Sequence, residues 1–250
     1  MSKNNLAVKE EMEEVVVEEA ILPNATAKNN VRVMYNEEMK TKKKIIYKII
    51  KIMIDIIGAL IGTVLLIPAT IIIYFARKFS KEEQGPLFYE QLRYGKNGKI
   101  FRLYKYRSMC IGADEKLKEY LANNEEARKE FKKTHKLQND PRITKIGNFL
   151  RKTSLDELPQ MINILKGDMS FVGPRPVVEK EVEEYGEKKE KFLSVKPGLT
   201  GYWQVNGRSN TTYEERMEME LYYVDNCSLW LDIKIFFKTF ITVFKKEGAV

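Results

Sequence analysis

The longest apolar run in the chain is Ile56 to Phe75, twenty residues without a charged side chain. Twenty helical residues rise about 30 Å, which matches the hydrocarbon core of a bilayer. Basic residues both precede and follow the run, so both ends have the charge expected on the cytoplasmic side. Pro68 lies in the middle, where proline removes a backbone hydrogen bond and bends a helix. We predict a re-entrant membrane hairpin over residues 40–80 with its break at Pro68; a single kinked span is the alternative.

The following segment alternates bulky and polar residues, which predicts β-strands. Leu87–Tyr89 and Lys99–Tyr106 flank the turn signal Gly95-Lys96-Asn97-Gly98, so we expect a β-hairpin there. Residues 113–133 have the pattern of an exposed helix, and residues 145–166 are helical in pattern with a break near Pro159. Residues 167–176 and 197–210 are rich in turn residues and glycine, and they predict loops.

The last part of the chain is again helical in pattern. Residues 177–194 predict a charged helix, and Thr212 with Glu215 has the spacing of a capping box that opens another helix. Residues 228–247 combine Trp, Phe, Leu and Ile with interspersed lysines, which is typical of a helix in the membrane interface. A buried terminal helix is the alternative.

The pattern as a whole predicts a mainly α fold with a small β-hairpin region, in the α+β class. A re-entrant membrane helix hairpin at residues 40–80 precedes a cytoplasmic domain at residues 81–250, with a helical insertion at 113–133 and an amphipathic interface helix at 228–247. Residues 1–39 show no sustained period and predict a mostly disordered acidic tail, with a short helix as an option at Glu11–Ala20. The acidic start and the late apolar run argue against a secretory signal.

The charge of the chain indicates which classes of partner it can bind. The formal net charge is +8, and because residues 1–39 hold eight acidic and four basic residues, the rest of the chain carries about +12. Such an excess suits nucleic acid, anionic lipid or phosphorylated substrates. The two cysteines are far apart and form no CxxC, which argues against a zinc site or a disulfide framework. With one histidine in a polar run, acid–base chemistry falls to carboxylates, lysines or tyrosines.

The stretch TSLDELPQ, residues 153–160, places two carboxylates, Asp156 and Glu157, side by side in a chain with a formal net charge of +8. Structurally they can open a helix: Asp156 is a good N-cap with Pro159 as the third helical residue, or Ser154 is the cap with Glu157 as its capping-box partner. An acidic first turn is also favoured by the helix dipole. On the residues alone, a helix start and a catalytic pair remain alternatives.

The neighbours of the pair favour phosphate chemistry. Arg142, Lys145, Arg151 and Lys152 precede it, and Arg175 lies between two prolines that fix the backbone, which suits bidentate capture of phosphate. Carboxylates among arginines near glycine-rich loops suggest Mg²⁺ and a phosphorylated substrate, because Mg²⁺ often uses one or two carboxylates plus substrate phosphates. The chain contains neither a P-loop nor a GxGxxG motif.

The string LRKTSLDELPQMINILKGDMSFVGPRP, residues 150–176, resembles the core of the bacterial sugar transferases, which are monotopic polyprenyl-phosphate hexose-1-phosphate transferases. GPLFYEQLRYGKNGKIFRLYKYRSM, NDPRITKIGNFLRKTSLDE and PGLTGYWQVNGR match further family motifs, so that the resemblance covers roughly residues 45–250. The motifs are long, ordered and contiguous, which makes the resemblance specific.

The resemblance implies transfer of hexose-1-phosphate from a UDP-sugar to undecaprenyl phosphate, giving undecaprenyl-diphosphate-sugar and UMP, at the start of exopolysaccharide, capsule or glycan assembly. It implies that Asp156 is the nucleophile and a ligand of Mg²⁺, or alternatively Mn²⁺, and that Glu157 assists as the second catalytic carboxylate. The side chains expected to bind substrate phosphate are Lys105, Arg107, Arg151 and Arg175. Those hypothesised to contact the nucleotide-sugar are Tyr202, Trp203, Gln204, Asn206 and Arg208.

The same resemblance implies where the protein acts and with which partners. The protein would bind the lipid bilayer at the inner or plasma membrane with its catalytic domain facing the cytoplasm, and a homodimer and downstream glycosyltransferases are expected partners. The helix at 113–133 resembles an insertion of the larger exopolysaccharide-initiating members, which favours galactose or glucose. Ile67-Pro68 replaces the Ser-Pro pair at which the family's hairpin commonly breaks.

Two other functions fit parts of the sequence. A basic adaptor that binds the membrane surface without catalysis fits the composition, but it does not explain Arg175 between its prolines or the acidic pair among arginines. Nucleic-acid binding rests on net charge alone, and much of that charge flanks apolar segments, where it serves topology and lipid headgroups. We therefore expect an enzyme, and no nucleic-acid partner.

Overall fold

The computed structural model describes residues 25–80, 85–134, 137–207 and 211–244. The chain divides into two compact units, residues 1–50 and 51–250. Helix α2 (Ala25–Lys78) begins in the first unit, where neither glycine nor proline interrupts residues 25–50. The predicted disordered tail is therefore wrong for residues 25–39, which are helical. Residues 1–24, with the optional helix at Glu11–Ala20, lie outside the described residues.

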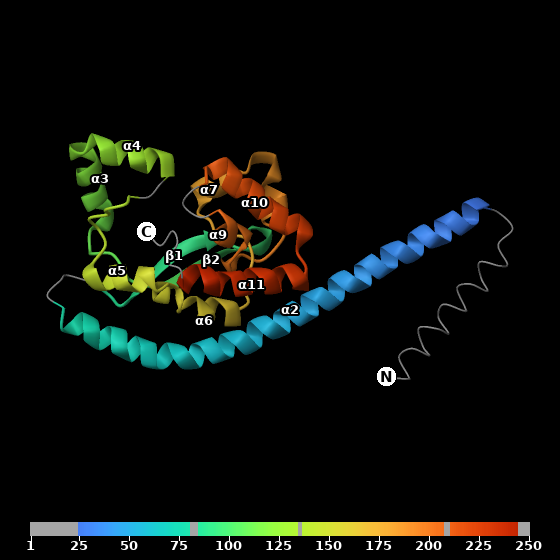
Figure 1. Ribbon diagram of the computed structural model, residues 1–250, viewed down its shortest axis with the longest axis horizontal. Coiled ribbons are helices and arrows are strands. Elements are labelled where there is room, and N and C mark those ends of the chain that lie inside the picture. The colour runs from blue at the N-terminus through green and yellow to red at the C-terminus, as the bar shows by residue number, and fades with distance from the viewer. Residues whose placement is uncertain (1–24, 81–84, 135–136, 208–210, 245–250) are drawn as a thin grey trace. The chain divides into compact units, whose positions relative to one another are not determined.

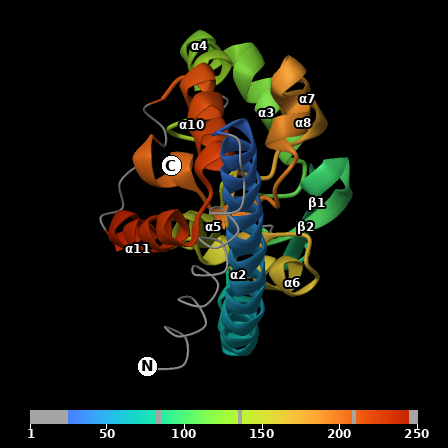
Figure 2. The same ribbon diagram turned by 90° about the vertical axis from the view of Figure 1, so that its right-hand side faces the viewer.

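The unit of residues 51–250 is mainly helical and contains two small sheets (Figures 1 and 2). The sheets are an antiparallel pair, β1 (Phe88–Tyr94) and β2 (Ile100–Tyr106), and a parallel pair, β3 (Ser170–Val172) and β4 (Gly198–Thr200). Besides the rest of α2, its helices are α3 (Ala113–Asn123), α4 (Glu125–Thr134), α5 (Lys145–Lys152), α6 (Gln160–Leu165), α7 (Glu179–Glu183), α8 (Lys189–Phe192), α9 (Tyr202–Asn206), α10 (Tyr213–Asn226) and α11 (Leu229–Phe244). Short 3-10 turns cover Lys96–Gly98, Leu155–Glu157 and Gly186–Lys188. The predicted α+β class is confirmed.

The predicted β-hairpin is confirmed, with a longer first strand than expected. Phe88 pairs with Tyr106 and Tyr94 with Ile100, so the ladder continues up to the turn. Asn97 has a φ of 56°, a left-handed conformation that asparagine tolerates better than most residues. The second sheet, by contrast, lies where loops were expected, because strands of three residues are too short to show an alternating pattern.

The predicted helix at 113–133 is two helices, and the helix at 145–166 breaks earlier than expected. Asn124 is extended, and its side-chain oxygen accepts a hydrogen bond from the Ala127 amide at 3.0 Å, which opens α4. In the second case α5 ends at Lys152, before Pro159 is reached. The capping box of Thr212 and Glu215 is confirmed at the start of α10.

Helix α2 packs on the domain by one narrow stripe. Ala59, Leu66 and Ile73 are buried at intervals of seven residues, against β2, α5 and α6. The other sides of the helix stay apolar and exposed. Over Thr41–Lys78 it is long and apolar enough to cross a membrane. An exposed apolar surface of this size indicates membrane association.

The predicted re-entrant hairpin is not confirmed. Helix α2 runs through Pro68 as one curved helix and does not reverse direction (Figure 1). Close to the proline, the Thr70 hydroxyl donates to the Leu66 carbonyl at 2.6 Å and contacts the Tyr106 hydroxyl at 2.5 Å. Serine and threonine side chains of this kind support a helix around a proline. How the two ends of α2 are placed relative to a bilayer stays a prediction.

Polar side chains anchor α2 to the domain at both ends of the packed stripe. Lys51 donates to Asp232 of α11 at 2.6 Å and to the Val172 carbonyl at 2.9 Å. One turn later, Asp55 accepts hydrogen bonds from the Ser170 hydroxyl and the Phe171 amide at 3.0 and 2.9 Å. At the far end Arg77 donates to the Gly85 carbonyl at 2.9 Å. These contacts fix the position of α2 along the domain.

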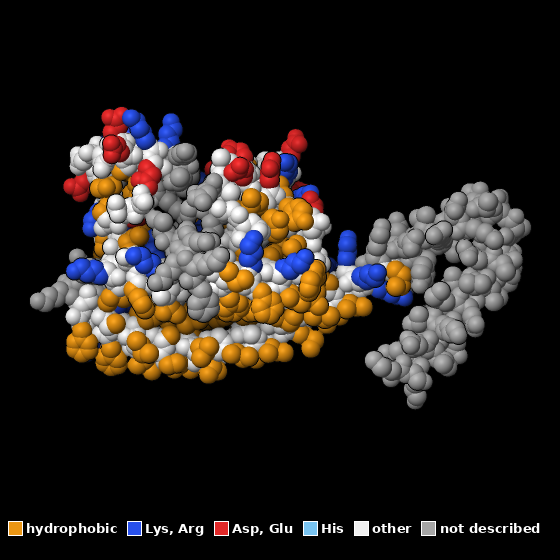
Figure 3. Space-filling view, viewed as in Figure 1, with side chains coloured by type: hydrophobic (Ala, Val, Ile, Leu, Met, Phe, Trp, Pro, Cys, Tyr) orange, Lys and Arg blue, Asp and Glu red, His pale blue; other side chains and the backbone are white. Residues whose placement is uncertain are grey.

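Helix α11 presents a second apolar surface next to α2. Its Ile235 is buried in the domain, whereas Trp230, Phe237 and Ile241 are exposed. Figure 3 shows apolar side chains gathered along this edge of the unit, over α2 and α11. The arrangement supports an amphipathic helix at this place, and its position in a membrane interface stays a prediction.

The anchor at Lys51 leads to a stability prediction. Replacing Asp232 by Ala leaves the Lys51 ammonium, 19% exposed, without its carboxylate, and breaking such a pair costs about 3 kcal/mol. The exposed pair Lys191–Asp225 is the control, because losing a surface ion pair costs only about 0–1 kcal/mol. Thermal unfolding of the purified protein in detergent should therefore show a much larger loss for Asp232→Ala than for Asp225→Ala. Equal losses would contradict the anchoring role.

Candidate active site

The Asp-Glu pair lies on the 3-10 turn Leu155–Glu157, between α5 and α6. Ser154, just before the turn, has a φ of 55°, which is uncommon for a residue other than glycine and redirects the chain. Neither expected cap is present: Ser154 makes no side-chain capping bond, and α6 begins only at Gln160, after Pro159. The two carboxylates are therefore not used to cap a helix.

The two carboxylates of the pair have opposite electrostatic environments. Glu157 accepts a hydrogen bond from the Lys105 ammonium at 2.7 Å. Burial alone would raise the pKa of Glu157, but Lys105 and Arg175 outweigh it, and the pKa lies below its usual value. Asp156 is 8% exposed, and burial raises its pKa to about 6; the Glu157 charge adds to the rise, whereas Lys105 and Arg151 oppose it. Asp156 is thus a carboxylate held in a partly protonated range near neutral pH.

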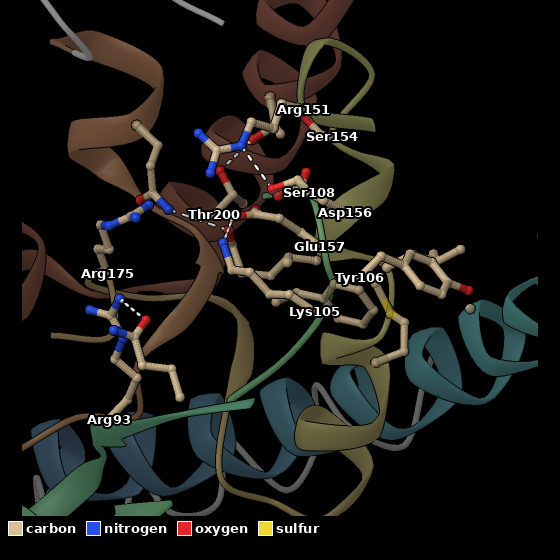
Figure 4. Close-up of a pocket in the computed structure, with 18 of the residues that line it drawn as sticks. Arg93, Lys105, Tyr106, Ser108, Arg151, Ser154, Asp156, Glu157, Arg175 and Thr200 are labelled. Atoms are coloured by element: carbon tan, nitrogen blue, oxygen red, sulfur yellow. Dashed lines mark hydrogen bonds and ion pairs between the residues drawn. The ribbon is translucent and has the colours of Figure 1, made fainter. Parts of the chain in front are cut away.

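Strand β2 and helix α5 supply the cations around the pair (Figure 4). Lys105 lies in β2 and Arg107 directly follows the strand. Because the two residues are two positions apart in extended chain, their side chains point to the same side. Arg151, in the last turn of α5, donates from Nε to the Ser108 hydroxyl at 2.9 Å. Arg107 lies over the Tyr89 ring at 5.3 Å and donates to the Pro86 carbonyl. Lys105, Arg107 and Arg151 all line one cavity with Asp156 and Glu157.

Arg175 reaches the same cavity from the segment after β3. The segment lies close to β4, because the Gly173 amide donates to Thr200 and the Gly198 amide donates to Pro174, at 2.9 and 2.8 Å. A Cβ on Gly173 would come within 2.4 Å of the Lys196 carbonyl, so this approach needs glycine. The prolines on both sides of Arg175 restrict the backbone further. These contacts hold the backbone at Arg175, and rigid presentation of its guanidinium stays a prediction.

A buried charge network holds this segment from behind. Glu220 accepts hydrogen bonds from the Arg175 amide at 3.3 Å, from Arg216 at 3.4 Å and from the Tyr185 hydroxyl. Burial and the carboxylate of Glu220 raise the pKa of Tyr185, which keeps its hydroxyl protonated as a donor. Arg93 adds a bond from Nη1 to the Pro176 carbonyl at 3.1 Å, next to Arg175 in Figure 4. These partners could not be predicted from the sequence, because they come from β1, the α7–α8 connection and α10.

The cavity has a volume of about 1270 Å³. Of the residues hypothesised to contact a nucleotide-sugar, Gln204 lines it. Asn206 does not; it is exposed and bonds the Tyr202 carbonyl and the Lys238 ammonium. Arg208 lies outside the described residues. Trp203, another residue hypothesised to contact the nucleotide-sugar, also lines the cavity, whereas Tyr202 does not. The sequence reasoning missed Ser108 and Thr200, which line the cavity too; both lie within quoted family motifs, but neither carries a charge that singled it out.

A metal ion in this cavity would need ligands from the substrate. In the part of the chain that the structure describes, no three His, Cys, Asp or Glu side chains form a metal cluster. Of the carboxylates that line the cavity, Asp156 and Glu157 lie among the cations, and Glu157 is already paired with Lys105. None of the described side chains donates a hydrogen bond to the Asp156 carboxylate. This donor set fits Mg²⁺ bound by one carboxylate and by substrate phosphates, and it does not fit a site closed by protein ligands.

The chemical capability of the cavity follows from these parts. Asp156 is a buried carboxylate, next to cations that can bind the oxygens of a phosphate or diphosphate. Buried charges that face a reacting phosphate stabilise the charge that develops on it. The arrangement is therefore suited to phosphoryl transfer with the carboxylate as a nucleophile.

Comparison with known proteins gives a consistent result. The family model described as "Bacterial sugar transferase" matches residues 46–246. The chain is 50% identical over 186 residues to the undecaprenyl-phosphate galactose phosphotransferase of Salmonella typhimurium, which covers 74% of this chain and 39% of the relative. It is 42% identical over 199 residues to the UDP-glucose:undecaprenyl-phosphate glucose-1-phosphate transferase of Escherichia coli, covering 76% and 39%.

A shorter relative matches along most of its length. The exopolysaccharide production protein ExoY of Sinorhizobium fredii is 43% identical over 195 residues, which cover 78% of this chain and 85% of the relative. The chain spans only about two fifths of the Salmonella and Escherichia proteins.

The raised pKa of Asp156 leads to a second stability prediction. At a pH above about 6 the buried carboxylate is charged, and its environment favours the neutral form more than water does. Asp156→Asn removes that charge at nearly constant shape, so it should raise the free energy of unfolding at pH 8 by about 1–3 kcal/mol. The gain should shrink as the pH falls below the folded-state pKa, because the carboxyl group of the wild type is then protonated too.

Thermal unfolding of the wild type and Asp156→Asn in detergent, at pH 8 and at a pH below the folded-state pKa of Asp156, measures this difference. Asp225→Asn is the control, because Asp225 is exposed near the end of α10 and does not line the cavity, so its substitution should change little. A loss of stability in Asp156→Asn at high pH would contradict the electrostatic account of the site.

Proposed function

The chain belongs to the bacterial sugar transferase family, and from this premise we propose that it transfers a hexose-1-phosphate from a UDP-sugar to undecaprenyl phosphate. The products would be undecaprenyl-diphosphate-sugar and UMP. The observation that carries the proposal is Asp156, a buried carboxylate with a raised pKa that lines one cavity with Lys105, Arg151 and Arg175. The names of the Salmonella and Escherichia relatives state transfers of this kind to undecaprenyl phosphate.

The reaction is proposed in two displacements at one phosphorus atom. A carboxylate oxygen of Asp156 attacks the β-phosphorus of the UDP-sugar, which carries the sugar, and the bond to the bridging oxygen breaks. UMP leaves with that oxygen, and an aspartyl-phosphosugar remains. A phosphate oxygen of undecaprenyl phosphate then attacks the same phosphorus, and the Asp156 carboxylate is released with its electron pair.

Each neighbouring side chain has a role in this scheme. Lys105 keeps Glu157 charged and lowers the pKa of Asp156 compared with burial alone, so that a useful fraction of Asp156 is ionised. Arg151 and Arg175 would bind phosphate oxygens, and so would Arg107, which lines the same cavity and lies over the Tyr89 ring. Glu157, at 2.7 Å from Lys105, is placed to orient that cation beside the reacting phosphate.

We include Mg²⁺, or alternatively Mn²⁺, as a cofactor held by Asp156 and the diphosphate. When bound, the ion supplies positive charge that neutralises the phosphate oxygens. The donor set of the cavity supports this, since it provides a carboxylate and leaves the other ligands to substrate and water.

The membrane side of the proposal rests on α2 and α11. A lipid substrate requires the site to lie at a bilayer, and the exposed apolar surfaces of these helices provide the attachment. We propose the inner or plasma membrane with the catalytic domain in the cytoplasm, where UDP-sugars are made. The relatives support galactose or glucose as the sugar and exopolysaccharide assembly as the setting. A homodimer and downstream glycosyltransferases remain proposed partners.

The second candidate is the membrane-surface adaptor. The exposed apolar helices fit it equally well, but an adaptor needs no buried carboxylate surrounded by cations, since such a group lowers stability. Nothing in the described residues favours nucleic acid over phosphate-bearing small molecules.

Release of UMP tests the proposed function directly. Purified full-length protein in nanodiscs, given undecaprenyl phosphate, Mg²⁺ and a panel of UDP-sugars, should release UMP with one preferred donor. Asp156→Asn should lower the rate by about a thousandfold or more, because the nucleophile is lost. Asp225→Asn, on the exposed surface of α10 and outside the cavity lining, is the matched control. Folded protein that releases no UMP with any donor would support the adaptor instead.

The pH dependence tests the electrostatics of the nucleophile. Only the ionised carboxylate attacks, so the rate should fall as the pH drops through about 6 and reach a plateau above it. Lys105→Met removes the cation that most lowers the pKa of Asp156, so the acid limb should move to higher pH. Lys99→Met is the control: Lys99 is exposed and pairs with Asp168 at 3.2 Å, away from the cavity lining. A limb that does not move in Lys105→Met would exclude Asp156 as the titrating group.

A further inference from the structure

The cavity that contains Asp156 continues beyond the charged residues into a groove between α2 and α11. The walls of the groove are apolar: Ile61, Gly62 and Leu65 from α2, and Ile233, Phe236 and Phe240 from α11. Its floor includes Met161 and Phe171, which pack closely against Gly62 and Gly58 of α2. One continuous cavity thus has a charged end and an apolar end.

We propose that this groove holds the first isoprene units of the acceptor's polyprenyl chain, while the acceptor's phosphate lies at the charged end. The inference rests on the proposed function, because it assumes a lipid-phosphate acceptor, and it adds where the lipid part binds. A nucleotide-sugar is polar along its whole length and has no part that matches an apolar groove. An isoprenoid monophosphate has one anionic end and one apolar chain, as the cavity does.

The charges along the cavity support this assignment. At the charged end, Lys105, Arg151 and Arg175 face the carboxylates. At the groove, the charged lining residues are Lys51, Asp55 and Asp232, and the structure pairs them internally: Lys51 with Asp232 at 2.6 Å, and Asp55 with Ser170 and Phe171. The described walls of the groove therefore present no unpaired charge to an apolar chain.

Two hydroxyl groups mark the place where the cavity changes character. Thr200 of β4 and Thr239 of α11 are 2.8 Å apart, and both line the cavity. On the charged side of this pair lies the Asp-Glu turn, and on the other side the rings of Phe171, Phe236 and Phe240 are in edge contact. The phosphate and the first carbons of a prenyl phosphate would meet at this boundary.

The groove is also open to the phase from which a lipid comes. Ile61 and Phe240 are 60% and 49% exposed although they line the groove, and they adjoin the apolar outer faces of α2 and α11 (Figure 3). Because lipid tails are as apolar as these side chains, leaving the bilayer adds little hydrophobic free energy. The groove would therefore act mainly by packing around the isoprenoid chain and fixing its position, so that the acceptor's phosphate lies at Asp156.

Neighbouring residues on both helices provide matched variants. Ile61 lines the groove and Leu60 does not, and both are similarly exposed on α2. On α11, Ile233 lines the groove and Ile241 does not. Ile61→Trp and Ile233→Trp fill the groove, whereas Leu60→Trp and Ile241→Trp place the same bulk on the outer face. Ile61→Ala and Ile233→Ala serve if a tryptophan variant fails to fold, which thermal unfolding shows.

The experiment is photo-crosslinking of full-length protein in nanodiscs with a diazirine-bearing farnesyl phosphate, followed by peptide mapping. We expect labelling on α2 and α11 at the groove residues, and competition by undecaprenyl phosphate but not by excess phosphatidylglycerol. The filling variants should lower labelling by about threefold to tenfold, the effect of losing one packed contact, and the outer-face controls should not. The alanine variants should lower it in the same direction.

Other results would overturn the inference. Labelling confined to the outer faces, or equal in groove and control variants, would show that the chain lies elsewhere. Equal competition by phosphatidylglycerol would show that the groove binds bulk lipid. UMP release by the wild type in the same preparation separates the two proposals: release with no groove labelling refutes only the groove, and groove labelling without release for any donor refutes only the transfer reaction.

Discussion

The ion pair between Lys51 and Asp232 is the constraint from which the rest of the unit follows. An apolar helix can slide or rotate on an apolar surface at little cost, but a buried charge must meet its partner. Lys51 and Asp55 at one end and Arg77 at the other each bond groups of the domain, so α2 has one register. That register places Leu66 and Ile73 against Tyr106, and the strand that carries Tyr106 also carries Lys105 to Glu157.

The site itself depends on the different electrostatic environments of two adjacent carboxylates, Asp156 and Glu157. Glu157 receives the nearest cation and stays ionised, and its charge helps to keep the pKa of Asp156 high. A carboxylate with a raised pKa is more basic, and its charge would be stabilised when a cation such as a metal ion binds beside it. The fold tolerates this unfavourable charge because other contacts hold the surrounding chain in place. The Glu220 cluster binds the Arg175 amide, and the pairing of β3 with β4 holds the segment before Arg175.

Short sequence patterns predicted local structure well, but they did not predict contacts between segments that lie far apart in the sequence. The turn at Gly95–Gly98 and the capping box at Thr212 are short signals with one physical solution, and both are confirmed. The family motifs pointed to Asp156, Lys105 and Arg175, which the fold brings to one cavity. The left-handed Ser154, the three-residue strands and the Glu220 cluster depend on segments far apart in sequence. At Pro68 a local rule predicted a break, and the helix continues there with packing from Tyr106.

The junction of a charged cavity with an apolar groove has a kinetic meaning. A water-soluble nucleotide-sugar reaches the charged end from solution, whereas a lipid held at α2 and α11 arrives by lateral diffusion within a plane. The two reactants would then use separate entrances and would not compete for one. The lipid could wait in its groove while UMP departs on the aqueous side, so the lifetime of a reactive acyl phosphate exposed to water would be short.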